Sequence, residues 1–339
     1  MVVEAARGMV GEDSSGLENP PGDVNNEQEG GSGMGIKSDK IWLDGEFVDF
    51  ADANVHILTH SLHYGLAAFE GIRCYKRDDG RSAVFRLREH VERLRDSCHI
   101  GTFPLPWTED EVIEACLETV RVNKFEDCYI RPLAFLGDGE MGLSAMSNKV
   151  RLAIIAWPWG TYLGDDGIKN GIRAKISSFS RHHVNSAMAK GKFTGQYINS
   201  ILAKREAMAD GYQEALMLDT NGFVSEGSGE NVFVVYKDKI YTTTYHEAIL
   251  GGITRDTIIT LAKERGYEIV ERRMTRDFLY VSDEIFVVGT AAEVTPIREV
   301  DRRQIGTGKP GPVTTELQKA YFDVVKGSAE DKHEWLTYV

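Results

Sequence analysis

Pairs of short apolar segments joined by turn-forming dipeptides constrain the fold of this chain more than any other feature of its sequence. An Asp-Gly pair at Asp44 separates the runs KIWL and EFV, and an Asn-Gly pair at Asn221 separates ALMLDT from FV. Both dipeptides tolerate positive φ, so each pair of runs is predicted to form a β-hairpin. Residues 231–236 and 239–243 are predicted as another hairpin. Antiparallel β-structure is therefore expected in both halves of the chain.

Amphipathic segments between these hairpins predict helices. Thr108 followed by Glu111 has the pattern of a capping box and predicts a helix that begins at residue 109. The predicted helices are residues 87–98, 109–122, 196–209, 254–265 (with Thr254 as N-cap) and 313–325, and further strands are expected at 129–133, 150–157, 172–178, 267–274 and 284–288. Helices and strands follow no strict βαβ rhythm, so the fold class is predicted as α+β rather than a doubly wound parallel sheet.

Two glycine-rich stretches divide the chain. Residues 1–38 are rich in glycine, asparagine, serine and acidic residues and show no hydrophobic periodicity, so they are predicted to be a disordered leader. Several glycines after Trp159 predict an interdomain connector at residues 166–175. We therefore expect a small N-terminal domain at 39–165 and a large domain at 176–339.

The composition excludes several classes of protein. The chain carries 39 basic and 52 acidic residues, a formal charge of −13, of which −5 belongs to the first 38 residues. An acidic chain without a basic stripe argues against nucleic acid as a partner. The sequence has no apolar run of about 18 residues, the length that a transmembrane helix needs. The four cysteines, at positions 74, 98, 116 and 128, show no paired spacing and are predicted to be reduced thiols (Cys74, Cys98, Cys116 and Cys128). Together with the lack of a signal or transit segment, this predicts a cytoplasmic location.

Sequence motifs for P-loop, zinc-protease and serine-hydrolase chemistry are missing, since the sequence contains no GxxxxGK[ST], HExxH or GxSxG. His182 and His183 are adjacent, so their side chains point in different directions. A solvated or hydrogen-bonding role is expected for them rather than a metal site.

A different group of residues suits pyridoxal 5′-phosphate (PLP). Lys192 and Tyr197 lie just before a predicted helix, Glu226 lies in the glycine turn SEGSGEN, and Thr254 and Thr290 lie in GGITRD and GTAAE. The cofactor's aldehyde needs a lysine, its pyridine nitrogen a carboxylate and its phenolic oxygen a donor. Its phosphate needs backbone N–H groups, hydroxyls and an arginine. Each residue alone has an ordinary explanation, so only the joint pattern favours this cofactor.

From about residue 40 to 339 the chain resembles the branched-chain amino acid aminotransferases, which belong to the class IV aminotransferase family of fold-type IV PLP enzymes, and it is most similar to the bacterial form. The matching segments occur in family order: HSLHYGLAAFEGIRCY, VFRLREHVERL, CYIRPLAF, PWGTYLG, KFTGQYINS, DTNGFVSEGSGENVF, GGITRDTI and GTAAEVTPI. The resemblance implies a small α/β domain and a larger pseudo-barrel domain that binds PLP. It also implies ping-pong transamination of L-leucine, L-isoleucine and L-valine with 2-oxoglutarate, giving branched 2-oxo acids and L-glutamate.

The resemblance implies roles for individual residues. Lys192 would form the Schiff base and act as catalytic acid and base, and its spacing from Tyr197 and Glu226 selects it over Lys190. The cofactor-binding residues would be Arg93, Lys192, Tyr197, Glu226, Ile253, Thr254 and Thr290. The substrate-binding residues would be Tyr64, Phe69, Arg73, Tyr129, Arg131, Tyr162, Ala291 and Ala292. In this set the aromatic residues would line an aliphatic pocket, the arginines would meet the distal carboxylate of glutamate, and the backbone at 290–292 would receive the α-carboxylate.

The expected partners are amino acids, 2-oxo acids and further copies of the chain. The family is dimeric at minimum, bacterial members also form homohexamers, and Tyr64 would act across a subunit interface. No membrane, nucleic acid or metal is expected as a partner. Two features depart from the family pattern. Phe193 and Thr194 stand where small residues are common, and the leader exceeds the usual bacterial start.

Three alternatives remain open from the sequence: another class IV enzyme, a non-catalytic scaffold and a dehydrogenase. A D-amino acid aminotransferase or an aminodeoxychorismate lyase would share the cofactor residues, but the Tyr-Ile-Arg segment at Tyr129 and the GTAAE segment favour the branched-chain L-enzyme. A non-catalytic scaffold on this fold is disfavoured by the presence of Lys192 and Glu226. An NAD-dependent amino acid dehydrogenase would need a dinucleotide fingerprint that the sequence lacks.

Overall fold

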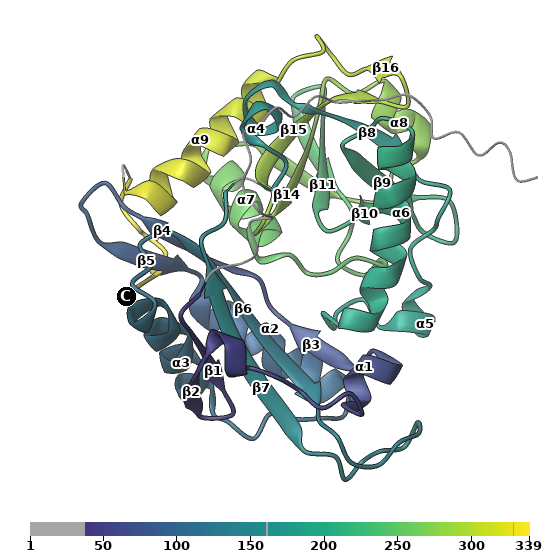
Figure 1. The fold of residues 1–339 in the computed structure, drawn as a ribbon. Helices are drawn as coiled ribbons and strands as arrows, with labels where there is room; N and C mark the ends of the chain where they lie inside the picture. Colours follow the sequence, from purple (N-terminus) through teal and green to yellow (C-terminus); the bar gives the residue numbers. More distant parts are fainter. Residues whose placement is uncertain (1–37, 161, 328) are drawn as a thin grey trace, which may run out of the picture. The chain divides into compact units, whose positions relative to one another are not determined.

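A computed structural model describes residues 38–160, 162–327 and 329–339. Except for Ser38, the predicted leader at residues 1–38 lies outside the described residues. The described part of the chain forms two β-sheets with helices packed against them (Figure 1). The predicted α+β class is confirmed.

Sheet A is antiparallel and comes mainly from the first half of the chain. Its strand order is β17-β5-β4-β6-β7-β1-β2, and β3 pairs with β6. The strands are β1 (Lys40–Leu43), β2 (Glu46–Asp49), β3 (Ala67–Phe69), β4 (Ile72–Lys76), β5 (Ser82–Phe85), β6 (Cys128–Leu136), β7 (Val150–Trp157) and β17 (Leu336–Tyr338). Because β17 pairs with β5, the last strand of the chain returns to the sheet built by the first half.

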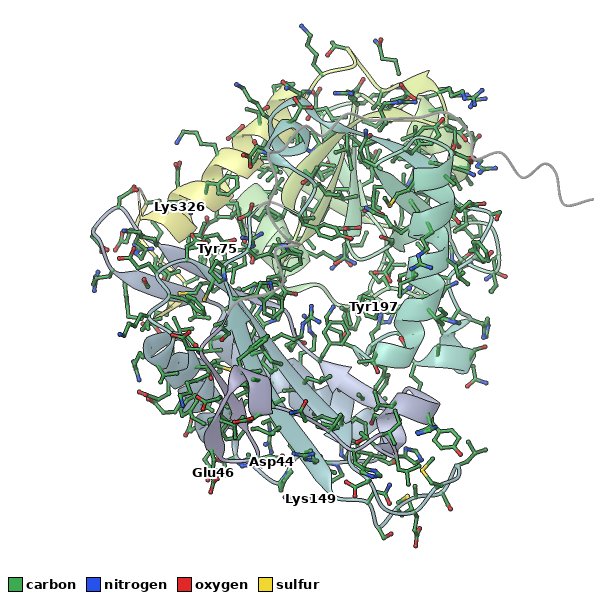
Figure 2. All side chains as sticks on the ribbon, in the orientation of Figure 1. Asp44, Glu46, Tyr75, Lys149, Tyr197 and Lys326 are labelled. Carbon is green, nitrogen blue, oxygen red and sulfur yellow. The ribbon has the colours of Figure 1, made fainter. Side chains whose placement is uncertain are left out.

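The hairpin predicted at Asp44 is confirmed as the pair β1–β2. Asp44 and Gly45 have φ of 56° and 109°, the positive values that the Asp-Gly pair tolerates. The Asp44 carboxylate also accepts a hydrogen bond from the Leu152 N–H at 3.0 Å, which ties the turn to β7. In Figure 2, Asp44 lies with Glu46 and Lys149 in the lower part of the view, whereas Tyr197 points into the region between the two sheets.

Helices cover one face of sheet A and form its core. They are α2 (Leu87–Ile100) and α3 (Glu109–Val122), with the short η1 (Phe50–Asp52) and α1 (His60–Tyr64) elsewhere in this half. The capping box at Thr108 and Glu111 is confirmed, with both of its hydrogen bonds present. Leu94 and Val112 from these helices pack against Ile130 of β6 in one buried cluster, so the amphipathic pattern of each helix has a partner face.

Sheet B is mixed and curls into a half-barrel (Figure 1). Its strand order is β10-β9-β8-β15-β14-β11-β12-β13, and β16 pairs with β15. The strands are β8 (Ile172–Ile176), β9 (Glu214–Leu218), β10 (Val224–Gly227), β11 (Asn231–Tyr236), β12 (Lys239–Thr242), β13 (Glu268–Glu271), β14 (Glu284–Gly289), β15 (Glu293–Val300) and β16 (Arg303–Gln304). The hairpins predicted at Asn221 and at 231–243 are confirmed as β9–β10 and β11–β12.

Sheet B is buried on both faces. Along β11, Val232 and Val234 enter one apolar cluster, while Phe233 and Val235 enter a second cluster that includes residues of α7 and α9. This alternation follows from the two-residue period of a strand. The helices of this half are α4 (Asp165–Asn170), α5 (Val184–Ala187), η2 (Thr194–Gln196), α6 (Tyr197–Ala209), α7 (Ile253–Glu264), α8 (Arg276–Tyr280) and α9 (Pro312–Lys326).

Two local predictions differ from the structure. The N-cap of α7 is Gly252, whose backbone is extended (φ −68°, ψ 131°), so the prediction of Thr254 as N-cap is wrong. Thr254 lies in the first turn instead, and it is 3% exposed. Strand β15 was not predicted either, and it contains Pro296, a residue type that is uncommon in central strands. In the sheet, β15 nevertheless lies between β8 and β14.

Membrane-spanning and metal-binding features are both missing from the described ranges. No helix there is long and apolar enough to cross a bilayer. The same residues contain no group of three or more His, Cys, Asp or Glu side chains that could hold a metal ion. All four cysteines are buried free thiols.

Candidate active site

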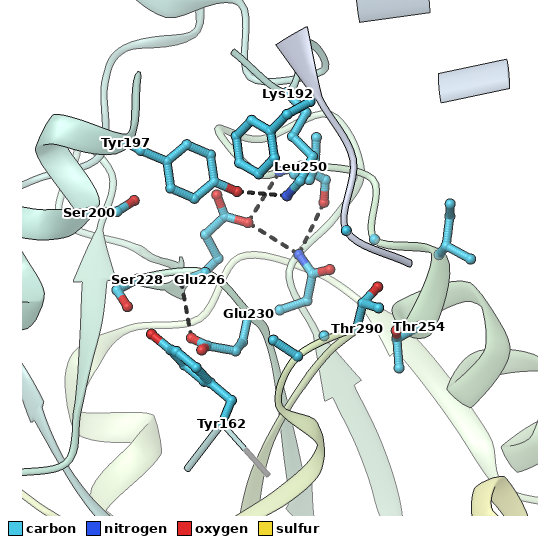
Figure 3. Close-up of a pocket in the computed structure, with 18 of the residues that line it drawn as sticks. Tyr162, Lys192, Tyr197, Ser200, Glu226, Ser228, Glu230, Leu250, Thr254 and Thr290 are labelled. Atoms are coloured by element: carbon cyan, nitrogen blue, oxygen red, sulfur yellow. Dashed lines mark hydrogen bonds between the residues drawn. The ribbon is translucent and has the colours of Figure 1, made fainter. Parts of the chain in front are cut away.

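The backbone of Lys192 is anchored to β3 and α2. Its carbonyl accepts a hydrogen bond from the Phe69 N–H at 3.1 Å, and its own N–H donates to Ser97 Oγ at 2.9 Å. Its Nζ donates to Tyr197 Oη at 2.6 Å, at the start of α6 (Figure 3). The structure therefore brings together the amine and the phenol that the sequence singled out.

The two residues that depart from the family pattern help to hold this segment in place. Phe193 is buried in the core of sheet A, and its backbone forms a bridge with Ala68 of β3. Thr194 Oγ1 donates a hydrogen bond to the Gly65 carbonyl at 2.9 Å. Both side chains thus anchor the lysine segment to sheet A.

Lys190 has a different environment from Lys192. Its Nζ donates to the backbone carbonyls of Tyr245, Glu247 (3.3 Å) and Ile249 (2.8 Å). An ammonium has three N–H donors, so these three acceptors engage all of them. Lys190 therefore fastens the loop before α7, whereas the Lys192 amine lines the cavity.

Glu226 is a buried carboxylate on β10. Its Oε1 lies 2.5 Å from Arg181 Nη2. Its Oε2 accepts hydrogen bonds from Asn231 Nδ2 at 3.2 Å and from the Leu250 N–H at 3.1 Å. Burial raises the pKa of Glu226, while Arg181, the Leu250 N–H and the Lys192 amine oppose that rise because they favour the ionised form. Arg181 and the N–H donors of Asn231 and Leu250 thus contact the buried carboxylate of Glu226 directly.

The N-terminus of α7 faces the same cavity. Gly252, Ile253 and Thr254 line it, and no side chain caps the helix. A Cβ on Gly252 would lie 2.0 Å from Asn231 Oδ1, so glycine permits the close approach of this turn to β11. Uncapped N–H groups and the helix dipole favour an anion at such a position. Thr290 lines the cavity from the end of β14.

Arg93 also lines this region, and a buried acid orients it. Glu70 accepts hydrogen bonds from Arg93 Nε at 2.7 Å and Nη2 at 2.8 Å, and Arg93 Nη1 donates to the Gly251 carbonyl at 2.9 Å. His90 Nδ1 lies 2.7 Å from the same carboxylate. Burial by itself would raise the pKa of Glu70. Arg93 and His90 have the opposite and larger effect, so the pKa lies well below its usual value. The guanidinium is thereby fixed next to the loop that precedes α7.

An aromatic wall closes the cavity on the side of sheet A. The Phe69 ring packs edge-on against Tyr197 with centroids 4.9 Å apart, and the Arg131 guanidinium lies 4.6 Å from the Phe69 centroid. Arg131 Nη2 donates to Tyr129 Oη at 3.2 Å, while its buried Nε has no partner among the described residues. Tyr162 completes the lining from the segment after β7. The wall thus combines apolar aromatic surface with the Arg131 guanidinium, whose Nε–H is available as a hydrogen-bond donor.

The cavity has a volume of about 480 Å³ and gathers most of the predicted site residues. Those that line it are Phe69, Arg93, Tyr129, Arg131, Tyr162, Lys192, Tyr197, Glu226, Ile253, Thr254, Thr290 and Ala291. Tyr64 and Ala292 do not line it: Tyr64 is 44% exposed on α1, and Ala292 is buried. Arg73 is also outside the lining, and its guanidinium donates to the backbone carbonyls of Trp159, Gly160, Thr290 and Ala291.

Several residues of the site were missed from the sequence. Arg181 precedes the two histidines and carries no motif that would mark it as the partner of an acid on a distant strand. Asn231 and Glu230 lie in the SEGSGEN segment but were given no role. Trp159 and Leu250 also line the cavity. Of these residues, only Glu230 and Asn231 could have been found from the sequence, because they follow Glu226 in the same glycine turn and must lie near it.

The chemistry of this residue set fits PLP. An amine and a phenol in contact suit the aldehyde and the phenolic oxygen, since Lys192 Nζ and Tyr197 Oη are 2.6 Å apart. The buried carboxylate of Glu226 suits a ring nitrogen that carries a proton. The uncapped turn at Thr254, together with Arg93, suits a phosphate.

Comparison with known proteins agrees with this fit. The family model described as amino-transferase class IV matches residues 67–300. The branched-chain-amino-acid aminotransferase of Pseudomonas aeruginosa is 52% identical over 306 residues, which cover 90% of this chain and 99% of the relative. The crystal structure of the Escherichia coli branched-chain amino acid aminotransferase superimposes with a TM-score of 0.87 at 46% identity, over 88% of this chain and 99% of that chain.

A further solved structure is a PLP form. The crystal structure of the branched-chain amino acid aminotransferase from Thermobaculum terrenum, in its PLP-bound holo form, gives a TM-score of 0.82 at 35% identity, over 90% of this chain and 99% of that chain. The family model spans more than half of the chain, and the relatives are covered almost completely. The chain therefore belongs to the class IV aminotransferase family.

Proposed function

We propose that this protein is a PLP-dependent branched-chain aminotransferase. It transfers the amino group of L-leucine, L-isoleucine or L-valine to 2-oxoglutarate and releases the branched 2-oxo acid and L-glutamate. The observation that carries the proposal is the contact of Lys192 Nζ with Tyr197 Oη, in a cavity that also contains the buried carboxylate of Glu226. The names of the relatives support the choice of substrates over those of other class IV enzymes.

The cofactor's own contribution is simple to state. When bound, PLP supplies an electron sink that makes the Cα–H bond of the attached amino acid acidic. Lys192 Nζ, in its neutral form, takes the Cα proton of the donor, and returns a proton to Cα when the keto acid is aminated. Tyr197 holds this amine in the cavity through its hydroxyl. One cavity serves both half-reactions, so the first product leaves before the acceptor binds, and the kinetics are ping-pong.

The remaining cofactor residues hold charges in place. Glu226 would keep a proton on the pyridine nitrogen. Arg181 stabilises the negative charge of the Glu226 carboxylate, since the two groups are 2.5 Å apart. The phosphate would take the N–H groups of the first turn of α7 at Ile253, the Thr254 and Thr290 hydroxyls, and the free donors of Arg93. Each of these groups lines the cavity.

The substrate side of the cavity has to accept both an aliphatic chain and a carboxylate. Phe69, Tyr129 and Tyr162 would surround the aliphatic chain of leucine. Arg131 would pair with the distal carboxylate of glutamate, because its Nε has no partner among the described residues. The backbone at Ala291 would receive the α-carboxylate. Arg73 would act on this turn indirectly, through its bonds to the carbonyls of Thr290 and Ala291.

A second copy of the chain is the protein partner that we propose. Large apolar side chains are exposed on and near α1 and on α6, including Ile57 (73%), Leu62 (60%), Leu143 (92%), Met146 (78%) and Ile198 (56%). Burial of such residues is the usual driving force for a stable dimer. Tyr64 lies among them, so it would reach the partner's cavity. A homodimer is the minimal assembly and a homohexamer a further one, and the location would be the cytoplasm.

The domain organisation is a proposal of the same kind. Sheet A would define the small domain at 39–165 and sheet B the large domain at 176–339, joined at 166–175, a segment that contains most of α4 and of the sheet B strand β8. The final strand β17 would belong to the sheet of the small domain, since it pairs with β5.

A panel of amino donors with 2-oxoglutarate as acceptor tests the function directly. We expect the purified protein to be yellow and to convert L-leucine, L-isoleucine and L-valine with formation of glutamate. Activity confined to D-alanine would show a D-amino acid aminotransferase instead. A colourless protein that binds no PLP would refute the enzyme.

A further inference from the structure

Two buried carboxylates, Glu226 and Glu230, line the cavity, and a third, Glu214, is buried near Glu230; only two of the three have a cation of their own. Glu226 pairs with Arg181, and Glu214 on β9 pairs with Lys204 of α6. Glu230, in the turn between β10 and β11, is 4% exposed and forms no ion pair with any described residue. The mechanism proposed above makes no use of Glu230, although it lines the cavity.

The surroundings of Glu230 favour its neutral form. Its Oε2 accepts one hydrogen bond, from the Gly229 N–H at 3.0 Å. Burial and then the negative charge of Glu214 raise the pKa of Glu230 to about 8, with a further contribution from Glu226, while Lys204 and the Gly229 N–H oppose the rise. A carboxylate buried without a cation costs several kcal/mol, so it binds a proton instead.

The titratable groups that face Glu230 come from three elements and one loop. Glu214 comes from β9, Lys204 from α6 and Glu226 from β10, and the fourth group is Tyr162, in the segment after β7. Figure 3 shows the Tyr162 hydroxyl next to the Glu230 carboxyl group. From the end of β14, Gly289 contributes only backbone, with the position of a Cβ 3.6 Å from Glu230 Cγ. Within the described residues, the total is thus two acids and one lysine around Glu230, besides the phenol.

We propose that Glu230 is a specificity-determining residue: it holds a proton at neutral pH, and this proton allows a pocket that binds aliphatic side chains to accept the distal carboxylate of a dicarboxylate as well. The inference rests on the proposed function. A neutral carboxyl group beside Tyr162 adds no charge to the wall that leucine would contact. After loss of the proton, the pocket would present a buried negative charge, which repels a second carboxylate but leaves an aliphatic chain largely unaffected.

The expected effect is a change in selectivity with pH. If the dicarboxylate binds only when Glu230 is protonated, its apparent dissociation constant increases as the protonated fraction falls. With a pKa of about 8, binding of the dicarboxylate is expected to be roughly tenfold weaker at pH 9 than at pH 7. An aliphatic monocarboxylate should show no such increase. The ratio of the two constants cancels the titration of groups that affect both ligands.

The test measures equilibrium binding of glutarate and of 4-methylpentanoate to the PLP-loaded protein by calorimetry between pH 6.5 and 9.5. Between pH 7 and pH 9, the ratio of the glutarate to the 4-methylpentanoate dissociation constant should increase about tenfold in the wild type and stay constant in Glu230→Gln, which is permanently neutral. Glu299→Gln is the control, because Glu299 pairs with Arg173 on β8 and should keep the wild-type increase. Infrared difference spectra between pH 7 and 9.5 should show loss of a protonated carboxyl band in the wild type and in the control, but not in Glu230→Gln.

Two results would overturn the inference. One is a ratio that stays constant with pH in the wild type, and the other is an unchanged increase in Glu230→Gln. If Glu230→Gln does not fold, the wild-type protein still tests the inference. Its ratio of dissociation constants must increase with pH, and its protonated carboxyl band must disappear between pH 7 and 9.5. Failure of the donor panel would refute the proposed aminotransferase function and leave the pH dependence of glutarate binding intact, so the two failures are distinguishable.

Discussion

Replacement of Glu70 by glutamine tests how strongly burial controls the ion pairs of this protein. The Glu70 carboxylate is 0% exposed and accepts two hydrogen bonds from Arg93, at 2.7 and 2.8 Å. The exposed pair of Arg121 and Glu114 has the same shortest distance of 2.7 Å, but its side chains are 38% and 59% exposed. Glu114→Gln is the solvent-exposed control, in which Arg121 also keeps Glu118 as a second partner.

The magnitudes follow from that difference. In Glu70→Gln the amide can accept only one of the two bonds, and the Arg93 guanidinium loses its counter-charge in a buried position. Breaking a buried pair in this way costs about 3–5 kcal/mol. Breaking the exposed pair of Glu114 costs about 0–1 kcal/mol, because water and salt screen it. We therefore expect the free energy of unfolding to fall by at least about 2 kcal/mol more in Glu70→Gln than in Glu114→Gln.

Urea unfolding followed by tryptophan fluorescence measures both losses at pH 7. With a slope of roughly 3 kcal/mol per molar urea for a chain of this size, the midpoint should fall by about 1 M in Glu70→Gln and by no more than about 0.3 M in the control. Equal shifts in the two variants would refute the argument from burial.

The pH dependence provides a second check of the same prediction. The folded-state pKa of Glu70 is lowered from the ordinary value of 4.5. A lowered carboxyl pKa contributes stability that is fully present above the unfolded value and is lost as pH falls through the folded value. The difference between wild type and Glu70→Gln should therefore be constant near neutrality and shrink below pH 4.5. A difference that grows on acidification would contradict the assignment of charge.

Three further changes test the site and the fold. Borohydride reduction of the PLP-loaded protein should fix the cofactor to the peptide that contains Lys192, and Lys192→Ala should lose this label while Lys190→Arg retains it, as mass spectrometry would show; labelling at Lys190 would reverse the assignment. Gly71→Ala should raise the KM for 2-oxoglutarate several-fold with little loss of stability, because the new Cβ would lie 1.8 Å from Tyr129 Oη and displace that hydroxyl; an unchanged KM would count against a role for Tyr129. Thr108→Ala should lower the free energy of unfolding by about 0.5–2 kcal/mol through loss of the capping box, measured by urea unfolding, and no loss would contradict its contribution.

Local signals in the sequence were reliable where the interaction partners are neighbours in the chain. The Asp-Gly turn at Asp44 and the capping box at Thr108 were both confirmed, because φ preferences and hydrogen bonds over three residues need no tertiary context. The N-cap of α7 was predicted incorrectly for a related reason. Gly252 is a weaker local signal than Thr254, and the close contact with Asn231 that selects a glycine comes from another strand.

The α+β class, the lysine, tyrosine and acid that suit PLP, and the resemblance to class IV aminotransferases could all be predicted from the sequence. Which charged side chains meet in the interior became visible only in the folded chain. Arg181 and Glu226 are 45 residues apart in the chain and 2.5 Å apart at the closest side-chain atoms. Burial of Glu230 without a cation likewise follows from how β9, β10 and α6 pack. Such pairings depend on long-range packing and on access of water, which no short segment of sequence encodes.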